Sequence, residues 1–108
     1  MNSLNSVLLE GVLVSDPELA YTENGPAVCR FKLESHRSYK AEDDLVEEVS
    51  YFDIVALVRL AEVCAEYLKK GRGVRVVGRL KQDGEKIVIE AEHVEFKAKR
   101  DVKEKDLK

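Results

Sequence analysis

The sequence has no tryptophan, only two cysteines, and no apolar run approaching the roughly 20 residues that span a bilayer. Cys29 and Cys64 do not form a C-x-x-C pair, and each lies in an apolar pattern. This predicts buried, reduced thiols rather than a disulfide or a metal site. The N-terminus MNSLNSVLLEG lacks a basic region and a small-residue cleavage site, so we expect a cytoplasmic protein with no membrane partner.

Motifs for catalysis are also missing. The sequence contains no Walker loop, H-E-x-x-H or G-x-G-x-x-G, and His36 and His93 have no evident nucleophile to pair with. Both histidines are predicted to be surface or interface imidazoles. Glu90, Glu92 and Glu95 are predicted to form the solvated face of an outer strand, because spaced acids alone bind hard cations poorly. We therefore expect no enzyme activity, no cofactor and no metal ion.

The length and charge of the chain limit its organisation. A chain of 108 residues with 44% hydrophobic content fits one compact domain. We expect that domain at residues 1–97, followed by a mobile charged tail at 98–108. The net charge of -3 gives no attraction to nucleic acid for the molecule as a whole, so any basic site has to be local.

Five segments have the pattern of β-strands. The first contains Gly11, which indicates a bulge or a close backbone approach. In the second, Cys29, Phe31 and Leu33 alternate with a basic face. The polar, acid-rich residues 38–48 are predicted to be a solvated loop, and residues 15–27 a loop or long hairpin arm. The predicted strands are residues 6–14, 28–34, 49–58, 73–80 and 86–96.

Residues 58–71, VRLAEVCAEYLKKG, have the spacing of an amphipathic helix. We expect Lys69 and Lys70 in its last turn and Gly71 as its C-terminal cap. The order is then three strands, one helix and two strands. This order favours an all-β OB-fold, a five-stranded Greek-key barrel with one helix between strands three and four. Other small β-barrels share the strand pattern, but the helix favours the OB-fold because it plugs one end of the barrel.

Basic residues cluster in two parts of the chain. Residues 67–82 contain six basic side chains and no acid, a pattern typical either of phosphate contacts or of an ordinary charged outer face. A second basic set accompanies Tyr39 and Tyr51, and basic grooves with interleaved aromatics are typical of single-strand binders. Because neighbouring strand residues point to opposite faces, Tyr51 and Phe52 cannot share one environment. The basic candidates are Arg30, Lys32, Arg37 and Lys40 in the second set, and Lys69, Lys70, Arg72, Arg75, Arg79 and Lys81 in the first.

Several motifs, in order, resemble the bacterial single-stranded DNA-binding proteins (SSB). They are EGVLVSDPELAYTENGPAVCRFKL, VSYFDIVALVRLAEVCAEYLKKG and VRVVGRL, within a match from Asn5 to Phe96. The resemblance implies an OB-fold subunit, usually a homotetramer, that coats single-stranded DNA without sequence specificity. Such proteins act in replication, recombination and repair, associated with the bacterial nucleoid.

The resemblance also implies roles for individual residues. Tyr39 and Tyr51 match stacking positions, and Leu57 falls at an aromatic base contact. Arg59, Lys70 and Lys81 match basic positions that meet the DNA backbone, and Phe52 matches a position near the subunit interface. The predicted phosphate contacts are therefore Arg30, Lys32, Arg37, Lys40, Arg59, Lys70, Arg72, Arg75, Arg79 and Lys81.

Four departures from the family pattern favour weaker binding, reduced wrapping of a long DNA strand or a different recruitment of partners. The stacking positions carry no tryptophan, and Asp53 stands where the family often has a basic residue. The hairpin after Lys81 is short, and the acidic C-terminal tip that recruits replication and repair proteins is absent. An alternative is an OB-fold replication assembly module, similar to primosomal proteins, in which protein contacts dominate and DNA binding is weak. We expect a homo-oligomer in either case, and favour a tetramer over a dimer.

Overall fold

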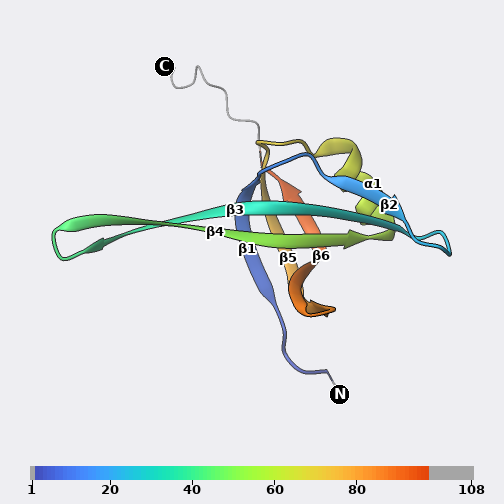
Figure 1. The fold of residues 1–108 in the computed structure, drawn as a ribbon, viewed down its shortest axis with the longest axis horizontal. Coiled ribbons are helices and arrows are strands. Elements are labelled where there is room, and N and C mark those ends of the chain that lie inside the picture. The colour runs from blue at the N-terminus through green and yellow to red at the C-terminus, as the bar shows by residue number, and fades with distance from the viewer. Residues whose placement is uncertain (1, 98–108) are drawn as a thin grey trace.

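The computed structural model describes residues 2–97, so the predicted tail at 98–108 lies outside the described residues. A compact barrel carries a long two-stranded extension (Figure 1). Within the described residues the one helix has ten residues, too few to cross a membrane. The elements in chain order are β1 (Val7–Leu13), β2 (Glu18–Tyr21), β3 (Ala27–Ala41), β4 (Asp44–Leu57), α1 (Val58–Tyr67), β5 (Gly73–Asp83) and β6 (Lys86–Phe96).

Five of the strands close into a barrel. The sheet runs β1-β5-β6-β4-β3, and β3 returns to β1 through the pairs Val12↔Glu34 and Leu13↔Leu33. The β4–β6 pair is parallel and the other pairs are antiparallel. This confirms the predicted OB-fold, with α1 placed between the third and fourth barrel strands. The sixth strand, β2, pairs with β3 in the segment predicted as a loop or hairpin arm.

The barrel interior is filled by the predicted inward face of β3. Cys29 and Leu33 are fully buried, and Phe31 is 5% exposed. Cys64 lies on the buried side of α1, which packs against the same core. Burial raises the pKa of Cys29 to about 11 and that of Cys64 to about 12, so both thiols stay protonated at neutral pH. The prediction of buried, reduced thiols is confirmed.

The end of α1 differs from the prediction. The helix stops at Tyr67, and Leu68 is already extended, with its N–H donating to the carbonyl of Cys64. Lys69 and Lys70 therefore lie in the following turn instead of the last helical turn. Gly71, at φ +90°, donates its N–H to the carbonyl of Leu13, so it shapes that turn and does not cap the helix. The chain leaves the helix early because Leu68, 2% exposed, is drawn into the core.

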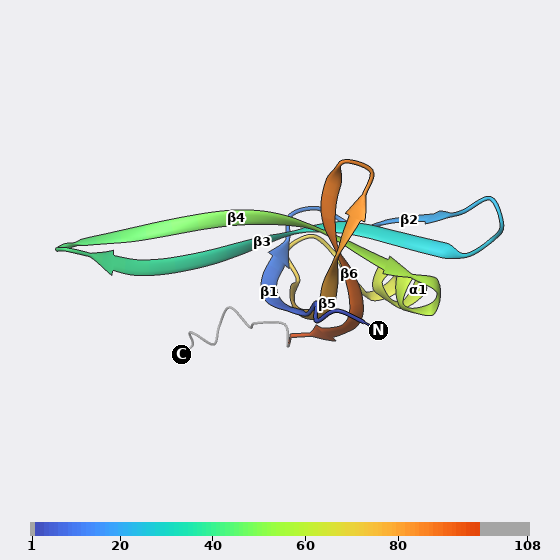
Figure 2. The ribbon, with the colours of Figure 1, turned by 90° about the horizontal axis from the view of Figure 1, so that it is seen from below.

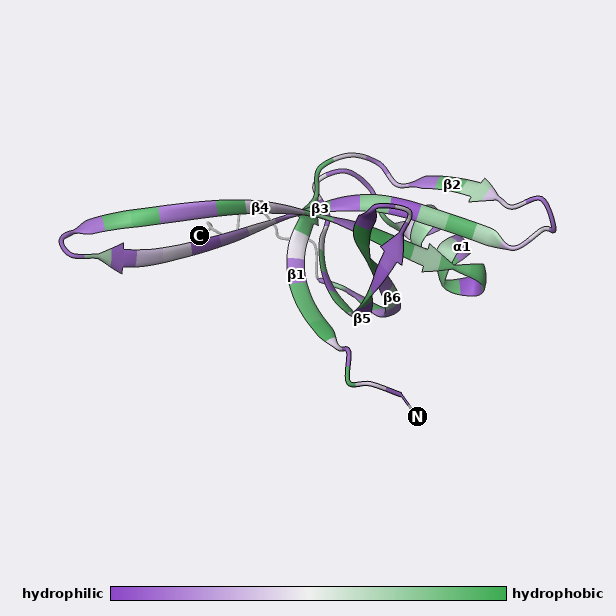
Figure 3. Cartoon of the chain, turned by 60° about the horizontal axis from the view of Figure 1, so that its bottom comes forward, coloured by the Kyte–Doolittle hydropathy of each residue, from purple (hydrophilic) through white to green (hydrophobic). Residues whose placement is uncertain are grey.

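The predicted loop at residues 38–48 is wrong. β3 and β4 continue as a hairpin up to the pair Ala41↔Asp44. We call residues 35–50 the arm, because these residues pair only with each other and project beyond the barrel (Figures 1 and 2). A two-stranded ribbon exposes both faces, so an acid-rich sequence can still form strands. Hydrophilic and hydrophobic positions succeed one another along the arm (Figure 3).

Two glycines mark close backbone contacts. A Cβ atom on Gly11 would lie 2.7 Å from the carbonyl oxygen of Glu34, which confirms the close approach predicted at this position. A Cβ on Gly78 would lie only 2.2 Å from the carbonyl oxygen of Glu90. The β5–β6 register shifts at Val77/Gly78, so this contact coincides with a bulge in the pairing. Both positions have room for hydrogen only.

Val58 begins α1 in a strained conformation. Its φ is +58°, a left-handed value that is unfavourable for a β-branched residue, and its side chain is exposed. We expect Val58→Gly to stabilise the fold by about 1 kcal/mol, because glycine adopts this φ without strain. Urea unfolding followed by circular dichroism would show a higher midpoint. Arg59→Gly is the matched control: this neighbour has no positive φ, and we expect a loss of about 0.5 kcal/mol. A lower midpoint for Val58→Gly would contradict the prediction that the backbone of Val58 is strained.

Candidate nucleic-acid interface

The pleat of β4 separates its two aromatic residues. Phe52 pairs with buried Leu33 and faces the core side, where it remains 37% exposed. Tyr51 is on the opposite, outer face and is 57% exposed. Tyr51, Asp53 and Leu57 share that face because strand residues two apart point the same way. The sequence prediction that Tyr51 and Phe52 have different environments is thus confirmed.

Two predicted cations from β3 share this outer face. The register pairs Lys32 with Asp53, and Arg30 with Val55. Lys32 and Arg30 are therefore directly across the strand pair from the line of residues that includes Tyr51. Arg79 and Lys81 lie on the same outer face, on β5, which is separated from β4 by β6. The structure brings together six predicted site residues here: Arg30, Lys32, Tyr51, Leu57, Arg79 and Lys81.

A groove of about 230 Å³ crosses this face. It lies between the β3–β4 pair and the β5–β6 hairpin, which projects from the barrel (Figure 2). The hairpin reaches back to β3, where an Arg30 Nη1–Asp83 Oδ2 ion pair of 3.1 Å connects the two walls. Charged side chains of both signs line the groove, among them Glu18, Arg30, Lys32, Asp53, Asp83 and Lys86.

Carboxylates already hold the cations on this face. The Asp53 carboxylate meets Lys32 at 3.9 Å and Lys86 at 3.5 Å. The Glu90 carboxylate meets Arg79 at 3.3 Å and Lys81 at 3.4 Å. Most of these side chains are substantially exposed, and exposed ion pairs stabilise by only about 0–1 kcal/mol. A phosphate can therefore replace the carboxylates as partner of these cations at little cost.

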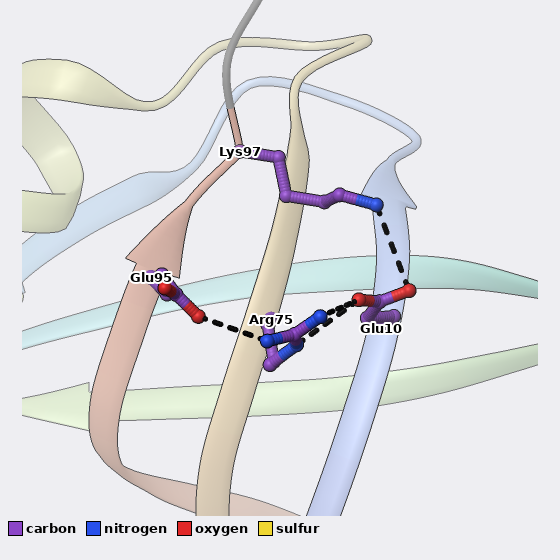
Figure 4. A network of polar contacts seen from close by, with 4 residues as sticks. All are labelled: Glu10, Arg75, Glu95 and Lys97. Atoms are coloured by element: carbon purple, nitrogen blue, oxygen red, sulfur yellow. Dashed lines mark hydrogen bonds and ion pairs between the residues drawn. The ribbon is translucent and has the colours of Figure 1, made fainter.

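Arg75, another predicted phosphate contact, lies toward the other end of β5 in a separate network (Figure 4). Its guanidinium donates to the Glu10 carboxylate from Nε at 3.0 Å and from Nη2 at 2.5 Å, and to Glu95 at 3.3 Å. Lys97 reaches the second oxygen of Glu10 at 3.6 Å. The hydrogen bond from Arg75 is the main reason that the pKa of Glu10 is lowered. Arg75 is thus committed to carboxylates on both sides.

Arg72 is also held away from the groove. Its Nε donates to the carbonyl oxygen of Lys97 at 3.1 Å, and its guanidinium lies 5.6 Å from the centre of the Phe96 ring. Arg59 is on α1, and Lys70 is in the turn between α1 and β5. The backbone N–H of Lys70 donates to Asp16 Oδ1 at 2.8 Å, which fixes that turn. Within residues 2–97 the side chains of Arg59 and Lys70 form no ion pair, so both stay open to an anion.

Tyr39 lies on the arm, on the other face of the ribbon from Tyr51. Its cross-strand partner on β4 is Val46, so the two side chains share a face. Val46 and Tyr51 are an odd number of residues apart on β4, and therefore point to opposite faces. The Arg37 guanidinium stacks 4.6 Å from the centre of the Tyr39 ring, and Arg37 also meets Glu48 at 3.4 Å. The two predicted stacking tyrosines are therefore on opposite faces of the β3–β4 ribbon. A single nucleic-acid strand that contacts both tyrosines has to pass around the arm.

The Tyr51 face of the arm carries Lys40 and His36. His36 contacts Glu34 through Nε2 and lies 3.7 Å from Glu47 through Nδ1. The hydrogen bond to Glu34 is the main reason that the pKa of His36 is raised. The surface imidazole predicted at His36 is therefore confirmed, in an ion-paired setting beside Tyr51.

Sequence reasoning missed two groove residues, Lys86 and Asp83. Both flank the two-residue turn of the β5–β6 hairpin, where Asp83 pairs with Lys86. Neither residue belongs to the basic run at residues 67–82, so neither is among the predicted site residues. Extending the strand alternation through the turn would have placed both side chains on the outer face.

The closed barrel, the plugging helix and the charged groove with an exposed tyrosine define an OB-fold domain, a class that binds oligonucleotides or oligosaccharides across this face. The model of the single-strand binding protein family matches residues 4–97. The chain belongs to that family.

Individual relatives agree with this assignment. The single-stranded DNA-binding protein of Treponema pallidum is 49% identical over 82 residues, which cover 76% of this chain and 47% of the relative. That of Borreliella burgdorferi is 43% identical over 83 residues, covering 77% and 56%. The wild-type single-stranded DNA-binding protein from Thermus aquaticus superposes with a TM-score of 0.79 at 30% identity, covering 90% of this chain and 52% of that one. The chain spans about half the length of these relatives.

Proposed function

We propose that the protein binds single-stranded DNA, with no required sequence, by stacking bases on Tyr51 and pairing phosphates with the groove cations. The observation that carries the proposal is the shared outer face of Tyr51, Arg30 and Lys32. Stacking on such a ring tolerates every base, and basic side chains around it follow the backbone. Family membership and the names of the relatives support the same activity.

The proposal extends to the setting of that activity. Residues 1–97 form the binding domain of a cytoplasmic, nucleoid-associated protein that protects single strands during replication, recombination and repair. The protein acts as a binder and not as an enzyme. It assembles as a homo-oligomer, with a tetramer favoured, and the partly exposed ring of Phe52 contributes to the interface. Contacts outside the groove come from Tyr39, Leu57, Arg37, Lys40, Arg59 and Lys70, whereas Arg72 and Arg75 are held by other partners.

Intrinsic tyrosine fluorescence tests the proposal directly, because the chain has four tyrosines and no tryptophan. Titration with oligo(dT) at low salt should quench the signal to saturation. If the five cations of the outer face all exchange onto phosphates, the log–log slope of affinity against salt should be about −3 to −4. These cations are Arg30, Lys32 and Lys86 in the groove, with Arg79 and Lys81 beside it.

A duplex of the same length is the control and should quench far less. Absence of quenching by oligo(dT) at low salt, from a folded protein, would contradict the proposal. That result would favour the replication assembly module, whose contacts are mainly with other proteins.

A further inference from the structure

Asp53 is the groove carboxylate that lies on the same strand as Tyr51. Glu34, directly across from Tyr51 on β3, is held by His36 and does not line the groove. Asp53 follows Tyr51 by two residues on the same face of β4, so the two side chains leave the strand about 7 Å apart. Its Oδ1 faces Lys32 on β3, and its Oδ2 faces Lys86 on β6. A base stacked on the Tyr51 ring can therefore place one edge toward the Asp53 carboxylate.

A carboxylate accepts hydrogen bonds and donates none. The exocyclic amino groups of cytosine, adenine and guanine donate, whereas thymine presents a carbonyl oxygen at the position where cytosine has its amino group. We propose that Asp53 selects bases that carry an exocyclic amino group at the site stacked on Tyr51, and disfavours thymine there. The inference rests on the proposed single-strand binding and adds a base preference to a sequence-tolerant groove.

The contacts of Asp53 leave it available for this role. Its two ion pairs, at 3.9 and 3.5 Å, are the longest in the groove and involve lysines that are at least half exposed. When Lys32 and Lys86 turn to the phosphates, the carboxylate is freed and needs a new donor. A base amino group supplies that donor. The lysines then bind the phosphates of the DNA, and Asp53 accepts a hydrogen bond from the base.

The other carboxylates in or beside the groove are less suited to read this base. Asp16, which lines the groove, accepts the backbone N–H of Lys70 at 2.8 Å. Asp83 is held by the Arg30 guanidinium at 3.1 Å, in the contact that connects the two walls of the groove. Glu90 aligns with Val55 on β4, four residues beyond Tyr51, and holds two cations. Glu18 pairs with Arg30 on β3, one strand further from Tyr51. Among these carboxylates, only Asp53 follows Tyr51 on the same strand.

The test compares a short oligo(dT) with the same oligonucleotide carrying a single central dC, each with a 5′ fluorescein, by anisotropy. We expect the protein to bind the dC oligonucleotide about fivefold more tightly. In Asp53→Asn, the side-chain amide offers both a donor and an acceptor, so the ratio should fall to about one. Affinity for oligo(dT) should rise about threefold, because a negative charge leaves the groove.

Glu18→Gln is the matched control, since it removes the same charge from another position in the groove. It should raise both affinities by the same factor and keep the fivefold ratio. A wild-type ratio of one, or a ratio that Asp53→Asn leaves unchanged, would overturn the inference while leaving single-strand binding in place. Failure of the wild-type protein to bind either oligonucleotide would overturn the proposed function itself, and the inference with it.

Discussion

Gly78→Ala should destabilise the barrel by at least about 3 kcal/mol, a large share of the 5–15 kcal/mol typical of a domain. The added methyl would lie 2.2 Å from the carbonyl oxygen of Glu90 and 3.1 Å from the Cα of Ala91. Both are backbone atoms, so no side chain can move aside to make room. The β5–β6 pairing would have to open at the bulge, next to the core residue Val76.

Urea unfolding followed by circular dichroism measures the loss as a lower midpoint. Gly73→Ala is the matched control on the same strand, because its nearest neighbour would be the flexible side chain of Lys97 at 3.6 Å. That variant should unfold within about 0.5 kcal/mol of the wild type. Equal midpoints for Gly78→Ala and Gly73→Ala would show that the close approach to Glu90 does not constrain position 78.

Tyr51→Ala should weaken binding of a short oligo(dT) about 5- to 150-fold, equivalent to the ~1–3 kcal/mol of one base stacked on an aromatic ring. The ring is 57% exposed on the outer face, so its removal takes away a contact surface without opening the core. Stability should stay close to that of the wild type. Tyr51→Phe, which keeps the ring and loses the hydroxyl, should bind nearly as well as the wild type.

Tyr21→Ala provides a second comparison. Tyr21 is as exposed as Tyr51, at 61%, but it pairs with buried Ala27 and so lies on the face of β3 opposite to Arg30. Its removal should leave the dissociation constant unchanged. Fluorescein anisotropy at fixed salt reports all three variants. If Tyr51→Ala and Tyr21→Ala bind alike, Tyr51 is not the stacking platform.

The barrel was predictable from the sequence because its strands are half buried. The alternation of Cys29, Phe31 and Leu33 with basic residues identifies a strand and its inner face from the pattern alone. The arm was not predictable in the same way. Both of its faces are solvated, so no period-two pattern of burial distinguishes residues 38–48 from a loop. The helix end was missed because tertiary burial of Leu68 outweighs the usual capping signals of lysine and glycine.

The part of the site that depends on alternation within a single strand was predictable from the sequence. Alternation alone places Tyr51, Asp53 and Leu57 on one face, and Arg30 with Lys32 on another strand. The partners of these cations depend on register and on the reach of the β5–β6 hairpin, neither of which appears in the sequence pattern. Thus Arg75 was predicted as a phosphate contact, although Glu10 and Glu95 enclose it in the folded chain.

The buried cysteines have a practical consequence for all of these measurements. Cys29 and Cys64 are the only thiols of the chain, both are fully buried, and their raised pKa values keep the reactive thiolate scarce. Maleimide reagents should therefore not react with these cysteines in the native protein. A cysteine introduced at an exposed position becomes the single labelling site, with no need to delete the natural ones. A dye attached there, at the tip of the arm, would then report by energy transfer to a labelled oligonucleotide the path of the bound DNA around the arm.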